Sequence, residues 1–484
     1  MKTAVIWFRR DLRLADNPAL ATALASHERI VPVYIHAPDE EAPWTPGAAS
    51  RWWLHHSLRA LDEDLRARGS RLHLARGPTL PALRQILRQS DATAVYWNRL
   101  YEPAISARDT QIKQGLRSDG IEAHSSKANI LFEPWEIRTG QEQPYRVFTP
   151  FWRKARAQLQ VRPPLPKPQR LVTPAGEAGL ALEELELLPR ISWDEQFHQR
   201  WTPGEAGASA AFEQFLESAL RDYASARDRP DREGTSKLSP HLHFGEISPR
   251  QIAWALEERV HHAGDSSRAA GAESFLREIG WREFSQHLLF NYPSMPEQNL
   301  NPRFDGFRWA SKDATAIRRW QQGRTGVPII DAGMRELWAT GSMHNRVRML
   351  VASFLTKNLR QHWHHGQRWF WDTLVDADLA NNAQGWQWTA GCGVDASPYF
   401  RIFNPVSQGG KFDPHGDYVR RWVAELASVA APLIHHPWTD PAILRSTGYP
   451  PPMVDLAASR TLALAAYRSE EHTSELQSHL NLVC

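Results

Sequence analysis

An acid, an indole and a guanidinium stand at helical spacing in the segment 278–284. Glu278, Trp281 and Arg282 occupy positions i, i+3 and i+4, so on a helix they share one face. Such a set suits a cavity that needs a polar clamp or a proton donor beside a platform for stacking. A surface Glu–Arg pair next to a buried tryptophan would give the same pattern. The segment therefore indicates a binding cavity only in combination with other motifs.

A second polar face is predicted further along the chain. Asn345, Arg348 and Met349 share a face by the same spacing, whereas Arg346 points elsewhere. Arg348 could pair with an aspartate of the Asp-x-Asp motif at 376–378. Burying such a pair is costly unless its geometry is fixed, so it indicates function rather than stability. The motif could also bind a hard cation, but no EF-hand loop surrounds it, and we expect no metal.

The segment 234–240 has the composition of a phosphate-binding turn. Its sequence, GTSKLSP, combines a glycine, three hydroxyls and a lysine just before a helical pattern. Backbone N–H groups at a helix start, together with hydroxyl donors, can bind phosphate. An ordinary helix N-cap is the simpler alternative.

Tryptophan is the one residue type in unusual abundance. The chain has 21 tryptophans among 484 residues. Trp386 and Trp388 lie two positions apart, so on a helix their side chains diverge by about 200°. One could face an inner site while the other faces a substrate. With Trp363 and Trp309 they could form a spaced aromatic series, although core packing would explain them as well.

A basic run interleaved with aromatic residues begins at Tyr399. Arginine, lysine, glutamine and flexible glycines in such a run suit contacts with phosphates and with an extruded base. The side chains that could make these contacts are Arg401, Gln408 and Lys411, with Arg227 and Arg346 extending the patch.

The elements that position these residues fall into two classes. Up to about residue 133, short apolar runs alternate with helical patterns, which predicts a parallel sheet with helices on both faces. The candidate strands are 4–8, 30–36, 71–75, 94–98 and 121–124. Asp16-Asn17-Pro18 predicts a helix start, and Leu54, Leu58, Leu61 and Leu65 form a core stripe.

A linker and a helical region follow. Residues 134–200 contain closely spaced prolines and an acidic stretch, which predicts a long surface connection. The pattern from residue 201 to 467 is helical, and we predict one all-α domain there. The fold class is therefore an α/β N-terminal domain, Rossmann-like with a parallel sheet, followed by an all-α domain.

Composition excludes several protein classes. Apolar residues make up 42% and charged residues 23%, which is typical of a globular chain. With 57 basic and 54 acidic residues the net charge is +3, too small to identify a nucleic-acid binder. Two cysteines exclude a disulfide scaffold. No G-x-G-x-x-G or P-loop motif is present. No segment has the pattern of a signal peptide or membrane span, so we expect a cytoplasmic protein.

The end of the sequence departs from the pattern before it. Residues 454–468 form a credible last helix, but 469–484 do not continue its apolar stripe. Residues 468–479 resemble the conceptual translation of a common sequencing adapter. We expect 468–484 to be a non-native tail that replaces the native C-terminus.

Together these blocks resemble the DNA photolyase/cryptochrome family. In order along the chain they read VIWFRRDLRLADNPAL, YASARDRPDREGTSKLSPHLHFGEISPR, FLREIGWREF, TGVPIIDAGMREL, MHNRVRM, DADLANNAQGWQW and SPYFRIFNPVSQGGKFD. The resemblance spans roughly residues 1–467. It implies an antenna-chromophore domain at 1–133, a linker at 134–200 and a helical FAD-binding and DNA-binding domain at 201–467.

The resemblance also implies roles for individual residues. FAD would be held by Tyr223, Thr235, Ser236, Lys237, Leu238, Ser239, Arg282, Asn345, Arg348, Asp376, Asp378 and Asn382. The lesion pocket and its catalytic contacts would involve Glu278, Trp281, Met349, Asn382 and Trp388, with DNA bound by Arg227, Glu278, Trp281, Arg346, Arg401, Gln408 and Lys411. Electron transfer to the flavin would run through Trp309, Trp363 and Trp386.

The implied activity is light-dependent repair of cyclobutane pyrimidine dimers by electron transfer from reduced FAD to the flipped-out dimer. The chain is most like the class I enzymes: Met343-His344-Asn345-Arg346 with Met349 is typical of cyclobutane-dimer enzymes, and (6-4) photolyases have a second histidine in place of Asn345. The partner would be UV-damaged DNA, bound by a monomer. The alternatives are a cryptochrome-type blue-light receptor that binds FAD without repair and a flavoprotein that only binds single-stranded DNA.

The second chromophore is left open. Folate-binding members of the family carry Asn-Glu shortly after a Tyr-Glu pair, whereas here Tyr101-Glu102 is followed by Pro103-Ala104-Ile105. The antenna is therefore methenyltetrahydrofolate, a deazaflavin, another flavin or none.

Overall fold

The computed structural model describes residues 2–174, 179–261 and 265–480, with side chains described up to residue 468. The chain forms two compact units. The first comprises residues up to Ala224, Ser236–Pro293 and Val375–Ala380. The second comprises Ser225–Thr235, Ser294–Leu374 and the residues from Asn381 onward. The predicted domain boundaries at 133, 200 and 467 stay predictions.

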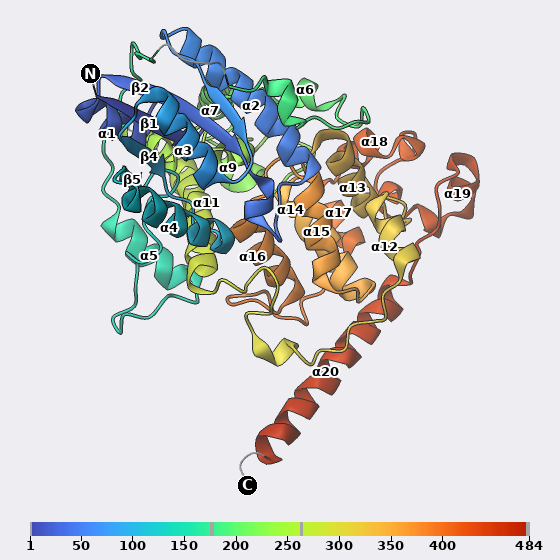
Figure 1. Cartoon of the computed structure of the whole chain (residues 1–484). Helices are drawn as coiled ribbons and strands as arrows, with labels where there is room; N and C mark the ends of the chain where they lie inside the picture. Colours follow the sequence, from blue (N-terminus) through green and yellow to red (C-terminus); the bar gives the residue numbers. More distant parts are fainter. Residues whose placement is uncertain (1, 175–178, 262–264, 481–484) are drawn as a thin grey trace. The chain divides into compact units, whose positions relative to one another are not determined.

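A five-stranded parallel sheet organises the first unit, which confirms the predicted α/β fold class (Figure 1). Its strands are β1 (Thr3–Phe8), β2 (Arg29–His36), β3 (His73–Arg76), β4 (Ala94–Asn98) and β5 (Glu122–Ser126). They lie in the order β3-β2-β1-β4-β5, so the chain reverses its direction of winding between β1 and β4. All five predicted strands are present, each within about two residues of its expected bounds, a shift usual for strand ends.

Helices cover both faces of the sheet, as the strand–helix alternation predicted. They are α1 (Pro18–Ser26), α2 (Ala48–Arg66), α3 (Thr79–Ser90) and α4 (Pro103–Ser118). Ala4, Ile6 and Phe8 pack with the leucine stripe of α2 on one face, whereas Val5 and Trp7 pack against α3 and α4 on the other. This alternation follows from the two-residue period of a strand. Burial of each leucine contributes roughly 1.5–3 kcal/mol.

The proline-rich linker is more than a surface connection. It contains α5 (Phe148–Gln158) and α6 (Phe197–Arg200). Leu171, Leu185 and Phe197 are almost fully buried in the α2 side of the α/β core. The expectation of a surface segment is therefore wrong at these residues, because apolar side chains of short helical turns and of the irregular chain between them fill the core beside α2.

The remaining elements are helical. In chain order they are α7 (Glu205–Ser218), α8 (Tyr223–Ala226), α9 (Ser239–His243), α10 (Pro249–Leu256), α11 (Ser266–Asn291), α12 (Ala314–Gln321), α13 (Pro328–Thr340), α14 (Asn345–Ser353), α15 (Trp363–Thr373), α16 (Leu379–Ala390), α17 (Pro405–Phe412), α18 (Asp417–Trp422), α19 (Pro441–Thr447) and α20 (Leu456–Leu480). Short 3-10 turns lie at Pro38–Glu41, Leu182–Leu185, Pro302–Phe304, Ala424–Leu426, Leu433–His435 and Pro437–Thr439, and π-helical turns at Glu257–His261 and Phe354–Asn358. In the described ranges β5 is the last strand.

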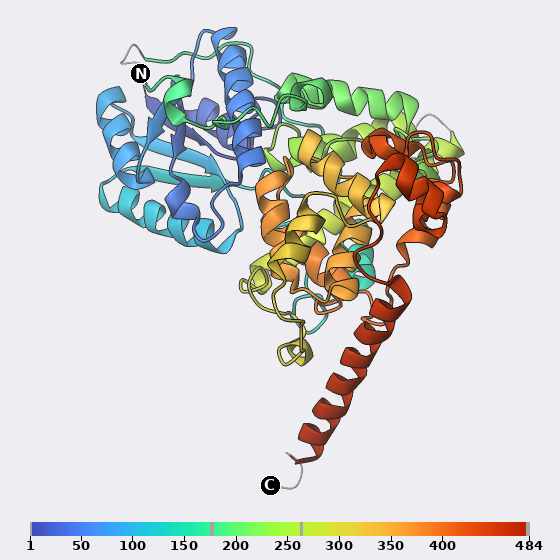
Figure 2. The same cartoon turned by 90° about the vertical axis from the view of Figure 1, so that its right-hand side faces the viewer.

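The last helix runs further than the sequence predicted. Figure 2 shows α20 as one continuous helix, and its backbone extends to Leu480 rather than ending near residue 468. The predicted non-native tail lies partly outside the described residues, at 481–484, and its origin stays a prediction. Among the described helices, none is long and apolar enough to cross a bilayer.

Candidate functional site

Helix α11 carries the acid–indole–guanidinium set, as predicted. Glu278, Trp281 and Arg282 all lie within this helix and are half-buried. The Trp281 ring stacks on Phe148 of α5, with 3.6 Å between centroids and 10° between planes. One indole face is therefore fixed by packing while the residue keeps access to solvent, which makes Trp281 a rigid platform for a second planar group.

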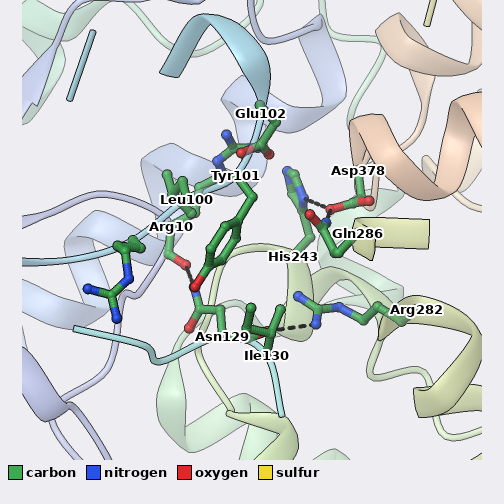
Figure 3. Close-up of a pocket in the computed structure, with 11 residues that line it drawn as sticks. Arg10, Leu100, Tyr101, Glu102, Asn129, Ile130, His243, Arg282, Gln286 and Asp378 are labelled. Carbon is green, nitrogen blue, oxygen red and sulfur yellow. Dashed lines mark hydrogen bonds and ion pairs between the residues drawn. The ribbon is translucent and has the colours of Figure 1, made fainter. Parts of the chain in front are cut away.

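Arg282 and Asp378 line one pocket in the first unit. Figure 3 shows this small pocket and the side chains that line it. The Arg282 guanidinium donates to the carbonyl of Asn129 at 2.7 Å, and Gln286 donates to Asp378 at 3.0 Å. His243 lies 3.8 Å from the same carboxylate. The structure thus brings together two residues predicted to bind the cofactor, and it adds Gln286 and His243, which the sequence motifs did not identify.

Residues that follow β4 complete this pocket. Glu102 pairs with Arg10 at 2.8 Å between Oε1 and Nη1, and the Tyr101 hydroxyl donates to Glu133 at 2.6 Å. Both polar groups of the Tyr-Glu pair therefore have partners inside the protein.

Glu283, next to the predicted site, is a buried carboxyl. One of its oxygens accepts from the backbone N–H groups of Leu131 and Phe132 at 2.8 and 3.1 Å. The other oxygen is buried without a hydrogen-bond partner among the described residues. Burial raises the pKa of Glu283 to about 7, against the smaller opposing effects of Arg282 and of the two backbone donors.

Replacing Glu283 by glutamine should change how stability depends on pH. Below about pH 4.5 the carboxyl is protonated in both the folded and the unfolded chain, so it contributes no pH dependence. Between 4.5 and 7 the unfolded chain loses the proton first, so wild-type stability falls by up to about 3 kcal/mol. Glu283→Gln keeps the acceptor and removes this fall. Urea unfolding at pH 5 and pH 8 measures the difference, with Glu273→Gln, an exposed site on α11, as control. Parallel pH profiles for Glu283→Gln and wild type would contradict the expectation.

The predicted phosphate-binding turn leads directly into α9. Lys237 has a φ of +56°, a conformation uncommon for a residue with a side chain, and the N–H of Leu238 donates to the Ser236 hydroxyl at 3.3 Å. Tyr223 is buried between Phe215 and Phe275. The roles of Thr235, Ser236, Lys237, Leu238, Ser239 and Tyr223 stay predictions.

Helix α14 carries the second polar face, with one correction. The Arg346 guanidinium pairs with Asp228 at 2.7 Å and also lies 3.7 Å from the sulfur of Met349. Arg346 was expected to point away from Met349, which is wrong because i and i+3 are neighbours on a helix. Arg348 donates to the carbonyl of Met343 at 2.7 Å. Its expected pairing with Asp376 or Asp378 stays a prediction, because those residues belong to the other unit.

Trp386 packs directly on the backbone of α15. A Cβ on Gly366 would lie 1.9 Å from its Cη2 atom, so only glycine allows this approach. Trp386 is 2% exposed, whereas Trp388 is half-buried, which confirms that the two side chains diverge. The side-chain amide of Asn382 donates to the carbonyl of Gln367 at 3.0 Å. This bond fixes the orientation of Asn382.

The two outer tryptophans have different surroundings. Trp363 is fully buried, and its indole N–H donates to Asn299 at 3.0 Å. Trp309 is half-buried, and its ring contacts Phe307 and His362. The hydrogen bond holds the Trp363 ring in one orientation, and Trp309 is accessible to solvent.

The predicted basic patch gathers partly around Phe412 at the end of α17. Arg346 and Lys411 both lie over this ring, at 4.5 and 5.1 Å from its centroid. Arg401 and Lys411 are exposed and Gln408 is half-buried. Arg227 is half-buried. The structure therefore brings together Arg346 and Lys411 of the predicted set.

Two buried polar residues near the aromatic series have roles that the motifs did not reveal. Gln387, between the two tryptophans of α16, is fully buried and its amide donates to the carbonyls of Met295 and Gln298. Lys357 is also fully buried, with its amine 3.4 Å from the centroid of the Tyr399 ring. Burial lowers the pKa of Lys357 well below its usual range.

Two family models match the chain. Residues 4–169 match the model described as DNA photolyase, and residues 275–469 match the FAD binding domain of DNA photolyase. A deoxyribodipyrimidine photo-lyase of Agrobacterium fabrum is 45% identical over 98% of this chain and 100% of its own length. Cryptochrome-2 of Arabidopsis thaliana is 41% identical over 97% of this chain and 79% of its own length. The crystal structure of a bacterial class III photolyase from Agrobacterium tumefaciens superposes with a TM-score of 0.93 at 44% identity, covering 98% of each chain.

Proposed function

The chain belongs to the DNA photolyase and cryptochrome family, and from this premise we propose that it repairs cyclobutane pyrimidine dimers in DNA under light. The observation that carries the proposal is the similarity to a photo-lyase over nearly the full length of both chains. The indole platform of Trp281 beside Glu278 on α11 supports it from the structure.

The residues present fit FAD. The side-chain amide of Gln367 is fully buried, and neither of its polar atoms has a partner among the described residues. The indole N–H of Trp386 is also buried and has no hydrogen-bond partner among the described residues. Buried polar atoms without partners are costly in a finished structure, so a polar group that binds beside α15 and α16 would satisfy them. Asn382, held by the carbonyl of Gln367, would present its amide to the flavin ring.

The other predicted FAD ligands complete the proposal. The hydroxyls and N–H groups of 235–239 would bind the phosphates, and Arg348, Asp376 and Asp378 would bind the polar edge of the ring system. Bound FAD supplies the photochemistry, an electron transferred to the dimer when the reduced flavin absorbs light. The chain's own contribution is to bind, orient and exclude water.

Lesion recognition is assigned to side chains that stack or donate. An unstacked, poorly paired dimer costs less to extrude than a normal base, and the fixed indole of Trp281 would stack on it. Met349 and Trp388 would contact the same lesion. Arg401, Gln408, Lys411, Arg346 and Arg227 would position the DNA through its phosphates.

Glu278→Ala should lower the yield of repair per absorbed photon by about tenfold while affecting lesion binding much less, because the protonated Glu278 carboxyl would donate a hydrogen bond to the dimer that strengthens as negative charge develops there. Repair of an oligonucleotide containing a thymine dimer measures the first quantity, and fluorescence anisotropy of the same oligonucleotide in the dark measures the second. Glu278→Gln keeps a donor and should retain more repair than alanine. Glu273→Ala, at an exposed position on the same helix, should match wild type. Equal losses in repair and in binding would refute the proposed role.

The subclass remains part of the proposal. The residues Asn345, Met349 and Asn382 favour a cyclobutane-dimer enzyme, and the class I assignment stays a prediction because a class III photolyase is among the similar structures. The similarity to Cryptochrome-2 of Arabidopsis thaliana favours a second candidate function, a blue-light receptor that binds FAD without repair.

One assay separates the two functions. Purified protein is reduced chemically, mixed with a thymine-dimer oligonucleotide and exposed to blue light, with a dark sample as control. Light-dependent loss of the dimer supports repair. FAD in the protein without loss of the dimer supports the receptor, and a protein that binds no FAD contradicts both.

A further inference from the structure

The ring of His362 lies between two tryptophans of the aromatic series in the second unit. Its centroid is 5.1 Å from that of Trp309, in an edge-to-face arrangement, and 5.6 Å from that of Trp363, in a stacked one. Among the described residues, Trp309 and Trp363 make no direct ring contact with each other. His362 is therefore the aromatic group that both tryptophans contact.

The backbone holds this arrangement in place. His362 is the N-cap of α15, and its Nδ1 atom accepts from the N–H of His364 at 3.2 Å. The N–H of Ala310 donates to the carbonyl of Arg360 at 2.9 Å. The residue after Trp309 is thus bound to a residue two positions before His362. These two bonds hold the backbone of the Trp309 segment beside the start of α15 and fix the orientation of the His362 ring.

His362 is electrically neutral at physiological pH. Because Nδ1 accepts a hydrogen bond, the neutral ring carries its proton on Nε2. Burial lowers the pKa of His362 to about 4, with a smaller contribution from His365. A neutral ring does not repel a neighbouring indole that becomes positively charged on oxidation, whereas an imidazolium would.

We propose that His362 is a positioning residue that provides the electronic contact between Trp309 and Trp363 during photoreduction. The proposal rests on the proposed function, in which these tryptophans carry electrons. In the step concerned, one electron leaves Trp309, which is oxidised, and reaches the already oxidised Trp363, which is reduced. The oxidised Trp309 then releases its indole proton to solvent, which its half-buried position allows. A thiol in solution then returns one electron and one proton to the neutral Trp309 radical, and the thiyl radicals so formed combine as a disulfide.

His362 is a poor candidate for the base that takes this proton. Its depressed pKa makes the imidazole a weak base, and its Nδ1 atom already accepts from His364. The proposed role of His362 therefore depends on the contacts of its ring with Trp309 and Trp363 and not on a change in its protonation.

Two substitutions separate the ring from the cap. His362→Asn keeps an acceptor suited to an N-cap and removes the ring. His362→Phe keeps a ring and removes the cap acceptor. Asp440→Ala removes the cap of α19, where the Asp440 carboxylate accepts from Ala442, and serves as the control for cap loss away from the aromatic series.

The test is flash photolysis of the FAD-loaded protein with the flavin oxidised. The measured quantity is the yield of long-lived oxidised tryptophan, alongside FAD occupancy and melting temperature. We expect a several-fold loss in His362→Asn, retention of most of the yield in His362→Phe and no change in Asp440→Ala. A wild-type yield in His362→Asn would overturn the proposal, as would equal losses in both His362 variants that follow the melting temperature.

The proposed function is tested separately in the same proteins. Chemically reduced wild type and His362→Asn should remove thymine dimers under light at the same rate, because the reduced flavin does not need the tryptophans. Failure of wild type in that assay contradicts the proposed function. If wild type repairs dimers but His362→Asn still gives the wild-type yield of oxidised tryptophan, only the role of His362 is contradicted.

Discussion

Trp386→Phe is expected to abolish light-driven reduction of the bound flavin while leaving dimer repair per bound flavin, in chemically reduced protein, close to that of wild type. Trp386 belongs to the predicted electron-transfer series, and its buried indole N–H is one of the groups proposed to face the flavin. A phenyl ring is far harder to oxidise than an indole, so it cannot donate the electron. The repair step starts from flavin that is already reduced and does not need this residue.

The effect on stability has to be separated from the effect on electron transfer. Trp386 is nearly fully buried and packs on Gly366 and Phe370, so the smaller ring leaves a cavity and costs on the order of 1–3 kcal/mol. Trp52 offers a matched control in the α/β core. It is also fully buried, and its indole N–H likewise has no partner among the described residues.

Three measurements on each variant complete the test. Absorbance during blue-light illumination with a thiol gives the rate of flavin reduction, the flavin released on denaturation gives FAD occupancy, and thermal unfolding gives stability. Trp52→Phe should lose stability and keep photoreduction. Photoreduction in FAD-loaded Trp386→Phe at the wild-type rate would contradict the assigned role.

Local patterns in the sequence were enough to predict the elements and the faces of helices. The divergence of Trp386 and Trp388 follows from the helical angle alone, and the structure confirms it. The close packing of Trp386 on Gly366 could not be predicted in this way. It depends on two helices meeting at one point, and a single sequence does not specify that contact.

Hydrogen bonds between residues far apart in the chain likewise could not be predicted from the sequence. Asp378 was predicted as a site residue from its motif, but its partner Gln286 lies 92 positions earlier. Arg346 shows the opposite kind of error, because its contact with Met349 is local and a stricter use of the i, i+3 rule would have found it. Motifs thus identified which residues carry chemistry, and tertiary packing decided what those residues contact.

Asp331 illustrates a residue whose importance appears only in the structure. It lies in the quoted motif TGVPIIDAGMREL without an assigned role. Its carboxylate is fully buried and accepts from the N–H and hydroxyl of Thr325, both at 2.7 Å, from the N–H of Gly326 at 3.0 Å and from the hydroxyl of Tyr449. Asp331 therefore ties the start of α13 to a segment 118 residues further along.

Asp331→Ala should destabilise the protein by about 4 kcal/mol, since it leaves several buried donors without an acceptor and each lost bond to a charged group costs roughly 1.5–3 kcal/mol, not additively. Urea unfolding measures the loss. Tyr449→Phe removes one donor and should cost about 1–2 kcal/mol, which gives a measurable variant if alanine at 331 does not fold. Asp313→Ala, which removes an exposed carboxylate that caps α12, should cost about 1 kcal/mol.

The loss of the Asp331 hydrogen bonds should also lower FAD binding, because α13 packs against α14. A Cβ on Gly333 of α13 would lie 2.4 Å from a methyl of Val347 on α14, so the two helices pack without slack. Val347 lies between Asn345 and Arg348, both predicted to hold FAD. A shift of α13 in Tyr449→Phe should therefore lower FAD occupancy, measured as released flavin per protein, whereas Asp313→Ala should not. An Asp331→Ala protein as stable as Asp313→Ala, with full FAD occupancy, would contradict both steps, because it would show that this buried carboxylate holds neither α13 nor the site beside it.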